Sequence, residues 1–237
     1  KILFVFAIAL EFVFVPLFLK AMWPNKTKKS LALKMVCTTL FVLVGLLAVQ
    51  ITGNTSGFAL LMMLGLILGA TGDFFLHVSP KPASLVTGAM SFLAGHLVYI
   101  FAFRWVMIKY IPDVNFISPL EIAVIALVYV GFIGYSFYKG SDFGAMLIPV
   151  VFYAAVLITT FVKASVLGVR LLAASVPNAA FMSGLLMSGA LLFFISDTLW
   201  SVINFNGHKK NRPLKYVNII TYYGAQILLA CTILVIS

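Results

Sequence analysis

The chain has 237 residues, of which 63% are hydrophobic and only 9% are charged, and its mean hydropathy is +1.14. This composition excludes a soluble domain, and continuous apolar runs of about 20 residues exclude the alternating pattern of a β-barrel. The net charge of +10 is attributed to basic loops that meet anionic lipid headgroups, and no nucleic acid partner is expected. We therefore predict an all-α, polytopic transmembrane bundle that forms one integral membrane domain over residues 1–237.

About eight spanning helices are predicted, because long apolar runs alternate with short breaks rich in Gly, Pro, Asn and Lys. Their expected ranges are 2–20, 32–52, 57–77, 83–104, 119–138, 144–163, 181–204 and 216–236. The segment 165–178 is apolar but contains Arg170 and Pro177, so we expect an interfacial helix there. Cys37 and Cys231 both lie inside apolar segments and are interpreted as small packing residues.

The distribution of basic residues predicts the orientation of the bundle. Eleven of the 16 Lys and Arg residues lie in or beside the connections that follow odd-numbered helices, and the other five lie on the opposite side. Cytoplasmic loops carry an excess of Lys and Arg, so these connections are expected in the cytoplasm and both termini outside. A bacterial inner membrane and an endoplasmic reticulum membrane are both compatible with the sequence.

Three ionisable side chains lie inside apolar segments: Asp73 in GLILGATGDFFLHV, His96 in SFLAGHLVYIF and Asp197 in LLFFISDTLW. Such groups are energetically costly at membrane depth and are usually functional. Asp73 lies four residues before the predicted end of its helix, roughly 6 Å from the cytoplasmic interface. Asp197 lies toward the same side, and His96 lies nearer the midplane. We therefore expect a polar pocket that opens toward the cytoplasmic half of the membrane.

Residues three and four positions apart share a helix face, so small and polar side chains form stripes on four of the predicted helices. These stripes are Gly65, Gly69, Asp73 and His77; Gly189, Asp197, Ser201 and Asn204; Asn218, Tyr222 and Gln226; and His96 and Tyr99, with Gly88, Ser91 and Gly95 nearby. Helix packing is the preferred explanation for the glycines, Ser91, Ser201 and Asn218. It is not adopted for the two aspartates, because no basic residue in a neighbouring helix interior is expected to pair with both.

Four motifs follow one another along the chain: GATGDFFL, FLAGHLVYIFAF, ALLFFISDTLW and TYYGAQILLA. In this order they resemble the YhhN-like lysoplasmalogenase family of integral membrane proteins, and the resemblance covers most of the chain. Lys34 also matches a family lysine, although Met35 stands where the family has proline. The resemblance implies an eight-helix fold and hydrolysis of the vinyl ether bond of lysoplasmalogens. The implied products are a fatty aldehyde and glycerophosphocholine or glycerophosphoethanolamine.

The buried aspartates suit that reaction, in which protonation of an alkene carbon gives an oxocarbenium ion that water captures as a hemiacetal. A carboxyl group that is desolvated, or that lies close to a second carboxylate, is harder to ionise. Asp73 and Asp197 are therefore the predicted catalytic pair and divide the acid and base roles between them. Which of the two is the acid does not follow from the sequence. Positioned proton transfer typically contributes about 10²–10⁴-fold to the rate.

The remaining predicted site residues would bind or orient the substrate. His96 and Tyr99 are expected to orient water or the hemiacetal hydroxyl. The expected pocket lining is Ser196, Tyr222, Tyr223 and Gln226. Lys34 is expected either to hold the substrate phosphate as a point charge or to snorkel toward the lipid interface.

Two other functions compete with this one. A metal-dependent intramembrane lipid hydrolase would use a mixed oxygen and nitrogen site made by Asp73, His77, His96 and Asp197. His77 lies at a helix end, however, and the interior holds no set of three histidines, so neither a metal nor another cofactor is expected.

A lipid transporter or lipid-binding protein would explain a polar cavity without chemistry, but the chain shows no internal repeat of interrupted helices. Glu11 is the strongest point for this alternative, and we interpret it either as a third pocket acid or as a structural group bonded to a neighbouring helix. The expected partners are a lysophospholipid substrate and membrane lipids. Headgroup preference and oligomeric state do not follow from the sequence.

Overall fold

The computed structural model describes residues 1–236, apart from the side chain at position 145, and contains no strand over that range. Its helices are α1 (Ile2–Ala21), α2 (Lys28–Thr52), α3 (Gly57–Val78), α4 (Pro82–Tyr110), α5 (Pro119–Tyr138), η1 (Gly144–Met146), α6 (Leu147–Ala173), α7 (Ala179–Phe205), α8 (Arg212–Cys231) and η2 (Thr232–Leu234). Eight of them are long and apolar enough to cross a membrane. The prediction of an all-α polytopic bundle is therefore confirmed, and the chain is a multi-pass membrane protein.

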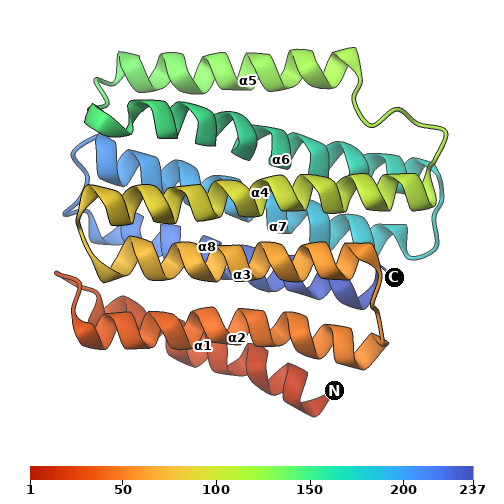
Figure 1. Cartoon of the computed structure of the whole chain (residues 1–237), viewed down its shortest axis with the longest axis horizontal. Helices are drawn as coiled ribbons and strands as arrows, with labels where there is room; N and C mark the ends of the chain where they lie inside the picture. The colour runs from red at the N-terminus through yellow and green to blue at the C-terminus, as the bar shows by residue number, and fades with distance from the viewer. Residues whose placement is uncertain (237) are drawn as a thin grey trace.

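The eight helices run up and down in one bundle (Figure 1). The connections after α1, α3, α5 and α7 lie at one end, on the left of Figure 1, and both chain ends lie at the other. Helix α3 packs on α4, α7 on α8, and α1 on α2, while α6 lies against α4 and α7. Helix α5 packs chiefly on α6 and is the most peripheral of the eight.

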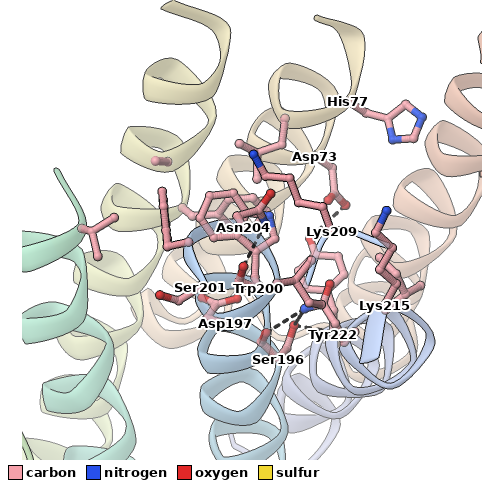
Figure 2. A pocket seen from close by; sticks show the side chains of 18 of the residues that line it. Asp73, His77, Ser196, Asp197, Trp200, Ser201, Asn204, Lys209, Lys215 and Tyr222 are labelled. Atoms are coloured by element: carbon pink, nitrogen blue, oxygen red, sulfur yellow. Dashed lines mark hydrogen bonds between the residues drawn. The ribbon is translucent and has the colours of Figure 1, made fainter. Parts of the chain in front are cut away.

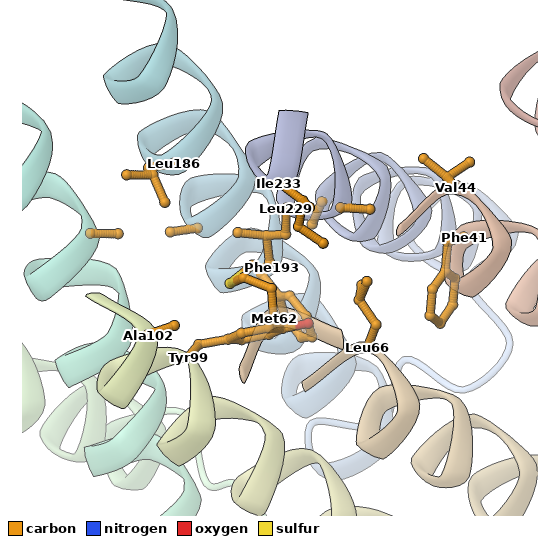
Figure 3. Packing of buried hydrophobic residues seen from close by; sticks show 14 of the residues in the cluster. Phe41, Val44, Met62, Leu66, Tyr99, Ala102, Leu186, Phe193, Leu229 and Ile233 are labelled. Atoms are coloured by element: carbon orange, nitrogen blue, oxygen red, sulfur yellow. The ribbon is translucent and has the colours of Figure 1, made fainter. Parts of the chain in front are cut away.

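The centre of the bundle is filled by buried hydrophobic side chains, which α2, α3, α4, α7, α8 and η2 contribute (Figure 3). The buried members include Phe41, Met62, Tyr99, Phe193 and Leu229. Lipid tails are as apolar as these residues, so close packing rather than exclusion of water has to hold the helices together. Gly65 makes one such approach possible: a Cβ atom at this position would lie 2.2 Å from the ring of Tyr99.

Helix α2 begins four residues before the predicted start at residue 32. Thr27 is its N-cap: the Thr27 hydroxyl accepts a hydrogen bond from the Ser30 amide, and the Ser30 hydroxyl accepts one from the Thr27 amide. This reciprocal pair satisfies two donors that the helix end leaves free. Because the helix starts early, Lys34 lies nearly two turns inside it and is buried.

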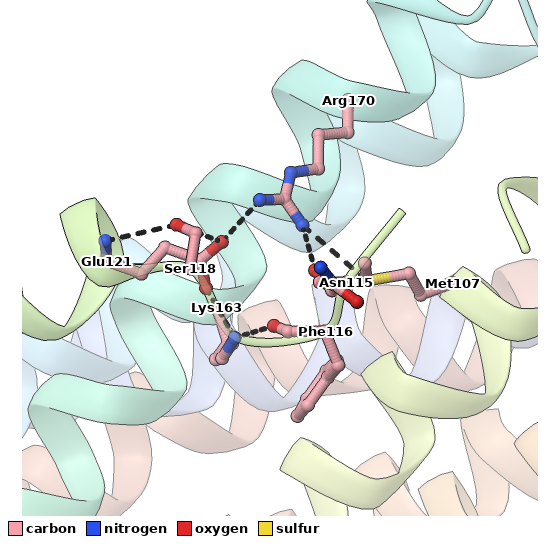
Figure 4. Close-up of polar contacts among 7 residues, drawn as sticks. All are labelled: Met107, Asn115, Phe116, Ser118, Glu121, Lys163 and Arg170. Carbon is pink, nitrogen blue, oxygen red and sulfur yellow. Dashed lines mark hydrogen bonds and ion pairs between the residues drawn. The ribbon is translucent and has the colours of Figure 1, made fainter. Parts of the chain in front are cut away.

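The prediction of an interfacial helix over 165–178 is wrong. Helix α6 continues without interruption to Ala173, and Pro177 falls in the turn that follows it. The charge of Arg170 is accommodated because Glu121, in the first turn of α5, accepts a hydrogen bond from its guanidinium at 2.6 Å (Figure 4). Glu121 also pairs with Lys163, which lies two turns before Arg170 on the same face of α6. One buried carboxylate thus compensates both basic residues of α6 and fastens α5 to it.

Candidate functional site

A cavity of about 520 Å³ lies inside the bundle. It lies at the end that carries the connections after α1, α3, α5 and α7. Its walls come from α3, α4, α6, α7 and α8, with contributions from α1, α2, α5 and the connections at that end. Both Asp73 and Asp197 line it (Figure 2). This volume is in the range of sites that hold small organic ligands. Two carboxyl groups separated by 124 positions in sequence (73 and 197) therefore face the same space.

Asp73 is an acidic group with a cation and two hydroxyl donors around it. Lys34 Nζ lies 2.8 Å from Oδ1. The hydroxyls of Thr38 and Tyr222 donate to Oδ2 at 2.8 and 2.9 Å. Lys34 and Thr38 lie one turn apart on the same face of α2, so a single helix supplies two of the three partners. The aspartate is only 2% exposed, and these partners occupy both of its carboxyl oxygens.

The hydrogen bonds continue behind Asp73 through α8 to α4. Gln226 Nε2 donates to the Tyr222 hydroxyl at 3.1 Å, and the Tyr99 hydroxyl donates to Gln226 Oε1 at 3.2 Å. Gly69 on α3 makes room for this link, since a Cβ atom there would lie 2.6 Å from Gln226 Nε2. The chain Tyr99–Gln226–Tyr222 therefore fixes the orientation of the donor that faces Asp73.

Asp197 has different partners. The hydroxyl of Tyr153, on α6, donates a short hydrogen bond to Oδ2. His96 Nε2, on α4, lies 3.5 Å from the same oxygen, and no Lys or Arg pairs with this carboxyl group within residues 1–236. The imidazole is packed among aromatic rings, with the Phe193 ring centroid 4.6 Å away. Asp197 thus faces the cavity from a mostly aromatic wall, whereas Asp73 faces it from a charged one.

Ser196 and Asn218 join α7 to α8 beside Asp197. Asn218 Nδ2 donates to the Ser196 carbonyl at 2.7 Å and to its hydroxyl at 3.0 Å, and Ser196 Oγ donates to the Asn218 carbonyl at 3.1 Å. Both residues line the cavity but are almost fully buried. These paired contacts set the position of α7 at the turn that carries Asp197.

The predicted site residues fall into two groups. Those that line the cavity are Lys34, Asp73, Ser196, Asp197 and Tyr222. Those that lie behind its wall are His96, Tyr99, Tyr223 and Gln226. Within the second group, His96 contacts Asp197 directly, and the Tyr99–Gln226 pair reaches Asp73 through Tyr222. Tyr223 packs against Phe18 and Phe41 in the core. Glu11, which the sequence left open, is buried near Cys37 and does not line the cavity.

Sequence reasoning missed several residues of this site. Thr38 carried a signal, because it stands four positions after Lys34 and so shares its helix face. Tyr153 carried almost none, because a tyrosine in an apolar helix is as compatible with a lipid-facing position as with a buried one. Three further lysines that line the cavity, Lys26, Lys209 and Lys215, were assigned only to basic loops.

A metal site in a protein needs several side-chain donors close together. Within the described part of the chain, no three His, Cys, Asp or Glu side chains are close enough to share a metal ion. His77, which the metal hypothesis placed beside Asp73, has its Nε2 atom 2.8 Å from the Ser30 hydroxyl. His77 is therefore tied to the start of α2.

The fold and the site define a polytopic membrane protein with a polar, two-carboxylate cavity inside its helical bundle. The chain belongs to the YhhN family, whose family model matches residues 29–233, and this range includes both aspartates. It is also similar to a lysoplasmalogenase homolog from Dictyostelium discoideum, with 28% identity over 167 residues. That alignment covers 66% of this chain and 54% of the relative, so the chain spans about half the length of the curated relative that it matches. No solved structure matches the chain.

Proposed function

We propose that this protein is a lysoplasmalogenase, which hydrolyses the vinyl ether bond of a lysophospholipid to a fatty aldehyde and a glycerophosphodiester. Membership of the YhhN family and similarity to a protein named a lysoplasmalogenase homolog support this activity. The observation that carries it is the asymmetry of the two aspartates, which line one cavity but have unlike partners. Paired carboxyl groups in different environments are a common arrangement for acid and base catalysis.

The partners of each aspartate support a different role for each of the two residues. Asp73 has Lys34 at 2.8 Å and two hydroxyl donors, so it is the negatively charged member that stabilises a cation and accepts a proton from water. Asp197 faces the cavity from a wall of aromatic rings and has no Lys or Arg partner within residues 1–236, so we assign it the role of proton donor. Oδ2 of Asp197 is occupied by Tyr153, which leaves Oδ1 to carry the proton toward the substrate.

The reaction then balances over one cycle. Asp197 gives its proton to the alkene carbon on the chain side, and the ether oxygen shares the positive charge of the resulting oxocarbenium ion. Water attacks the carbon bonded to that oxygen and gives a proton to Asp73, which forms the hemiacetal. Asp197 then removes the hemiacetal hydroxyl proton while Asp73 returns its proton to the departing glycerol oxygen. The aldehyde and the glycerophosphodiester leave, one water molecule has been consumed, and both aspartates are restored.

The orientation of the cavity is part of the proposal. Eleven of the 16 Lys and Arg residues lie at the end of the bundle where the cavity opens, and this end is proposed to face the cytoplasm. The host membrane is a bacterial inner membrane or an endoplasmic reticulum membrane.

The test is aldehyde release from a lysoplasmalogen by the detergent-purified protein. Asp73→Asn and Asp197→Asn should each lower kcat by at least about 100-fold, because each removes a proton-transfer group. Asp113→Asn is the control, since Asp113 is an exposed residue between α4 and α5. Release that a strong chelator abolishes and a divalent metal restores would indicate the metal-dependent hydrolase. A folded wild-type protein that releases no aldehyde would refute the proposal and leave lipid binding or transport.

A further inference from the structure

Four lysines line the cavity, and among residues 1–236 only one of them has an acidic partner. Lys34 pairs with Asp73, whereas Lys26, Lys209 and Lys215 make no ion pair within residues 1–236. Asp73 and Asp197 are the acidic residues of the lining, so two positive charges remain uncompensated even if both are ionised. Figure 2 shows Lys209 and Lys215 on the same side of the cavity as Asp73.

Lys26 and Lys215 are held at the cavity mouth by uncharged groups. The Lys26 ammonium donates to the Leu76 carbonyl at 2.7 Å, which draws this loop residue toward α3. The Lys215 ammonium lies 5.4 Å from the centre of the Trp23 ring, a distance at which a cation is attracted to the ring face. Both side chains are therefore positioned before any anion arrives.

These ammonium groups repel one another. The pKa of Lys26, in the connection between α1 and α2, is lowered from 10.5 to about 8, first by burial and then by the charges of Lys34 and Lys215. Asp73 and His77 of α3 line the same part of the cavity, and Asp73 is already committed to Lys34. An anion placed between Lys26 and Lys215 would relieve this repulsion.

We propose that Lys26 and Lys215, with Lys209 at the rim, bind the phosphate of the substrate headgroup. This inference rests on the proposed function and deepens it, because it makes the phosphate a determinant of specificity. Lysine ammonium groups bind phosphate oxygens as point charges and suit a phosphodiester that bears one negative charge. Phosphate binding was one of the two roles expected for Lys34, but its ammonium lies against the Asp73 carboxylate instead.

The site also fixes the direction in which the lipid lies. The far wall of the cavity is apolar and includes Phe132 of α5 with Val150 and Leu157 of α6. A headgroup at the lysines therefore directs the hydrocarbon chain toward α5 and α6. The short glycerol linker then places the vinyl ether between Asp73 and Asp197.

The experiment compares two substrates in neutral detergent micelles, so that no anionic lipid contributes. One is a lysoplasmalogen with a phosphoethanolamine headgroup, and the other is the 1-alkenylglycerol with the same chain and no phosphate. Lys26→Gln and Lys215→Gln should each raise KM for the phosphorylated substrate about tenfold relative to KM for the phosphate-free one. Lys28→Gln, an exposed lysine at the start of α2, should leave the ratio of the two KM values as in wild type. The site would be refuted if neither cavity variant changed the ratio of the two KM values. It would also be refuted if KM rose equally for both substrates.

A binding measurement separates this inference from the proposed activity. The probes are a lysophosphatidylethanolamine with an ester-linked chain, the monoacylglycerol with the same chain, and inorganic phosphate. Wild type should bind the phosphorylated lipid about tenfold more tightly than the monoacylglycerol, and Lys26→Gln with Lys215→Gln should remove that preference. This result supports the site even if no vinyl ether is cleaved. Inorganic phosphate that binds as tightly as the lipid would identify a site for the free ion and overturn the headgroup assignment.

Discussion

The ion pair between Lys34 and Asp73 provides the sharpest test of how the charged wall of the cavity is built. Lys34→Met removes the cation and keeps a side chain of similar length, while Asp73 stays buried at 2% exposure. Breaking a buried pair by removing one partner typically costs about 3–5 kcal/mol, because the other charge is left uncompensated. Asp73 retains the hydroxyl donors Thr38 and Tyr222, so we expect a loss near the lower limit, about 3 kcal/mol.

The double variant Lys34→Met with Asp73→Asn removes both charges together. Asn can still accept hydrogen bonds from Thr38 and Tyr222 through its amide oxygen. Most of the lost stability should therefore return, and the coupling energy between the two positions should be at least about 2 kcal/mol. If the two side chains did not interact directly, the effects of the two single variants would add, and no stability would return in the double variant.

The assay is the free energy of unfolding in mixed detergent micelles, measured for wild type, both single variants and the double variant. Lys28→Met is the matched control, because Lys28 is an exposed lysine of the same helix. It should change the free energy of unfolding by less than about 0.5 kcal/mol. If Lys34 instead snorkels to lipid headgroups, Lys34→Met will resemble the control and the coupling energy will be close to zero. That outcome would refute both the ion pair and the charge assigned to Asp73.

Three further predictions concern other parts of the site. Tyr153→Phe removes the donor to Asp197 and should lower kcat for aldehyde release about tenfold with little change in KM; a change confined to KM would contradict a positioning role. Gly65→Ala should lower the free energy of unfolding by about 1–3 kcal/mol, whereas Gly134→Ala, with open space around its Cβ, should not; equal effects would contradict the close packing at Gly65. The KM for a phosphorylated substrate should rise above about pH 8, because Lys26 then loses its charge, and the KM for the phosphate-free analogue should not.

The sequence predicted the fold because membrane-spanning helices can be recognised by their length and hydropathy alone. It also predicted that Asp73 and Asp197 lie toward the same end of the bundle, since helix number and direction determine depth. What it could not determine was the local start of α2. The Thr27 and Ser30 cap sets that start four residues early, and this shift moves Lys34 from the expected interface into the cavity.

Tyr153 and the continuity of α6 were missed for a different reason, which is that both depend on contacts between distant helices. Arg170 looked like a helix breaker because its partner, Glu121, lies 49 positions earlier in the chain. Tyr153 was not singled out because its partner, Asp197, lies 44 positions later in the chain. Helical spacing predicts which residues share a face, but it does not predict which helix that face meets.

The two proposals constrain each other through the polarity of the vinyl ether. Its carbon on the hydrocarbon side must receive the proton, and its carbon bonded to oxygen, on the glycerol side, must meet water. A phosphate at Lys26 and Lys215 places the glycerol side beside Asp73 and the hydrocarbon side beside Asp197, which contacts Tyr153 on α6. This orientation therefore requires Asp197 as the proton donor and Asp73 as the charged proton acceptor. These are the same roles that were inferred from the partners of each aspartate. A lipid bound in the opposite direction would place the charged Asp73 beside the carbon that needs a proton. Loss of the phosphate contacts should therefore reduce productive binding of the phosphorylated substrate specifically.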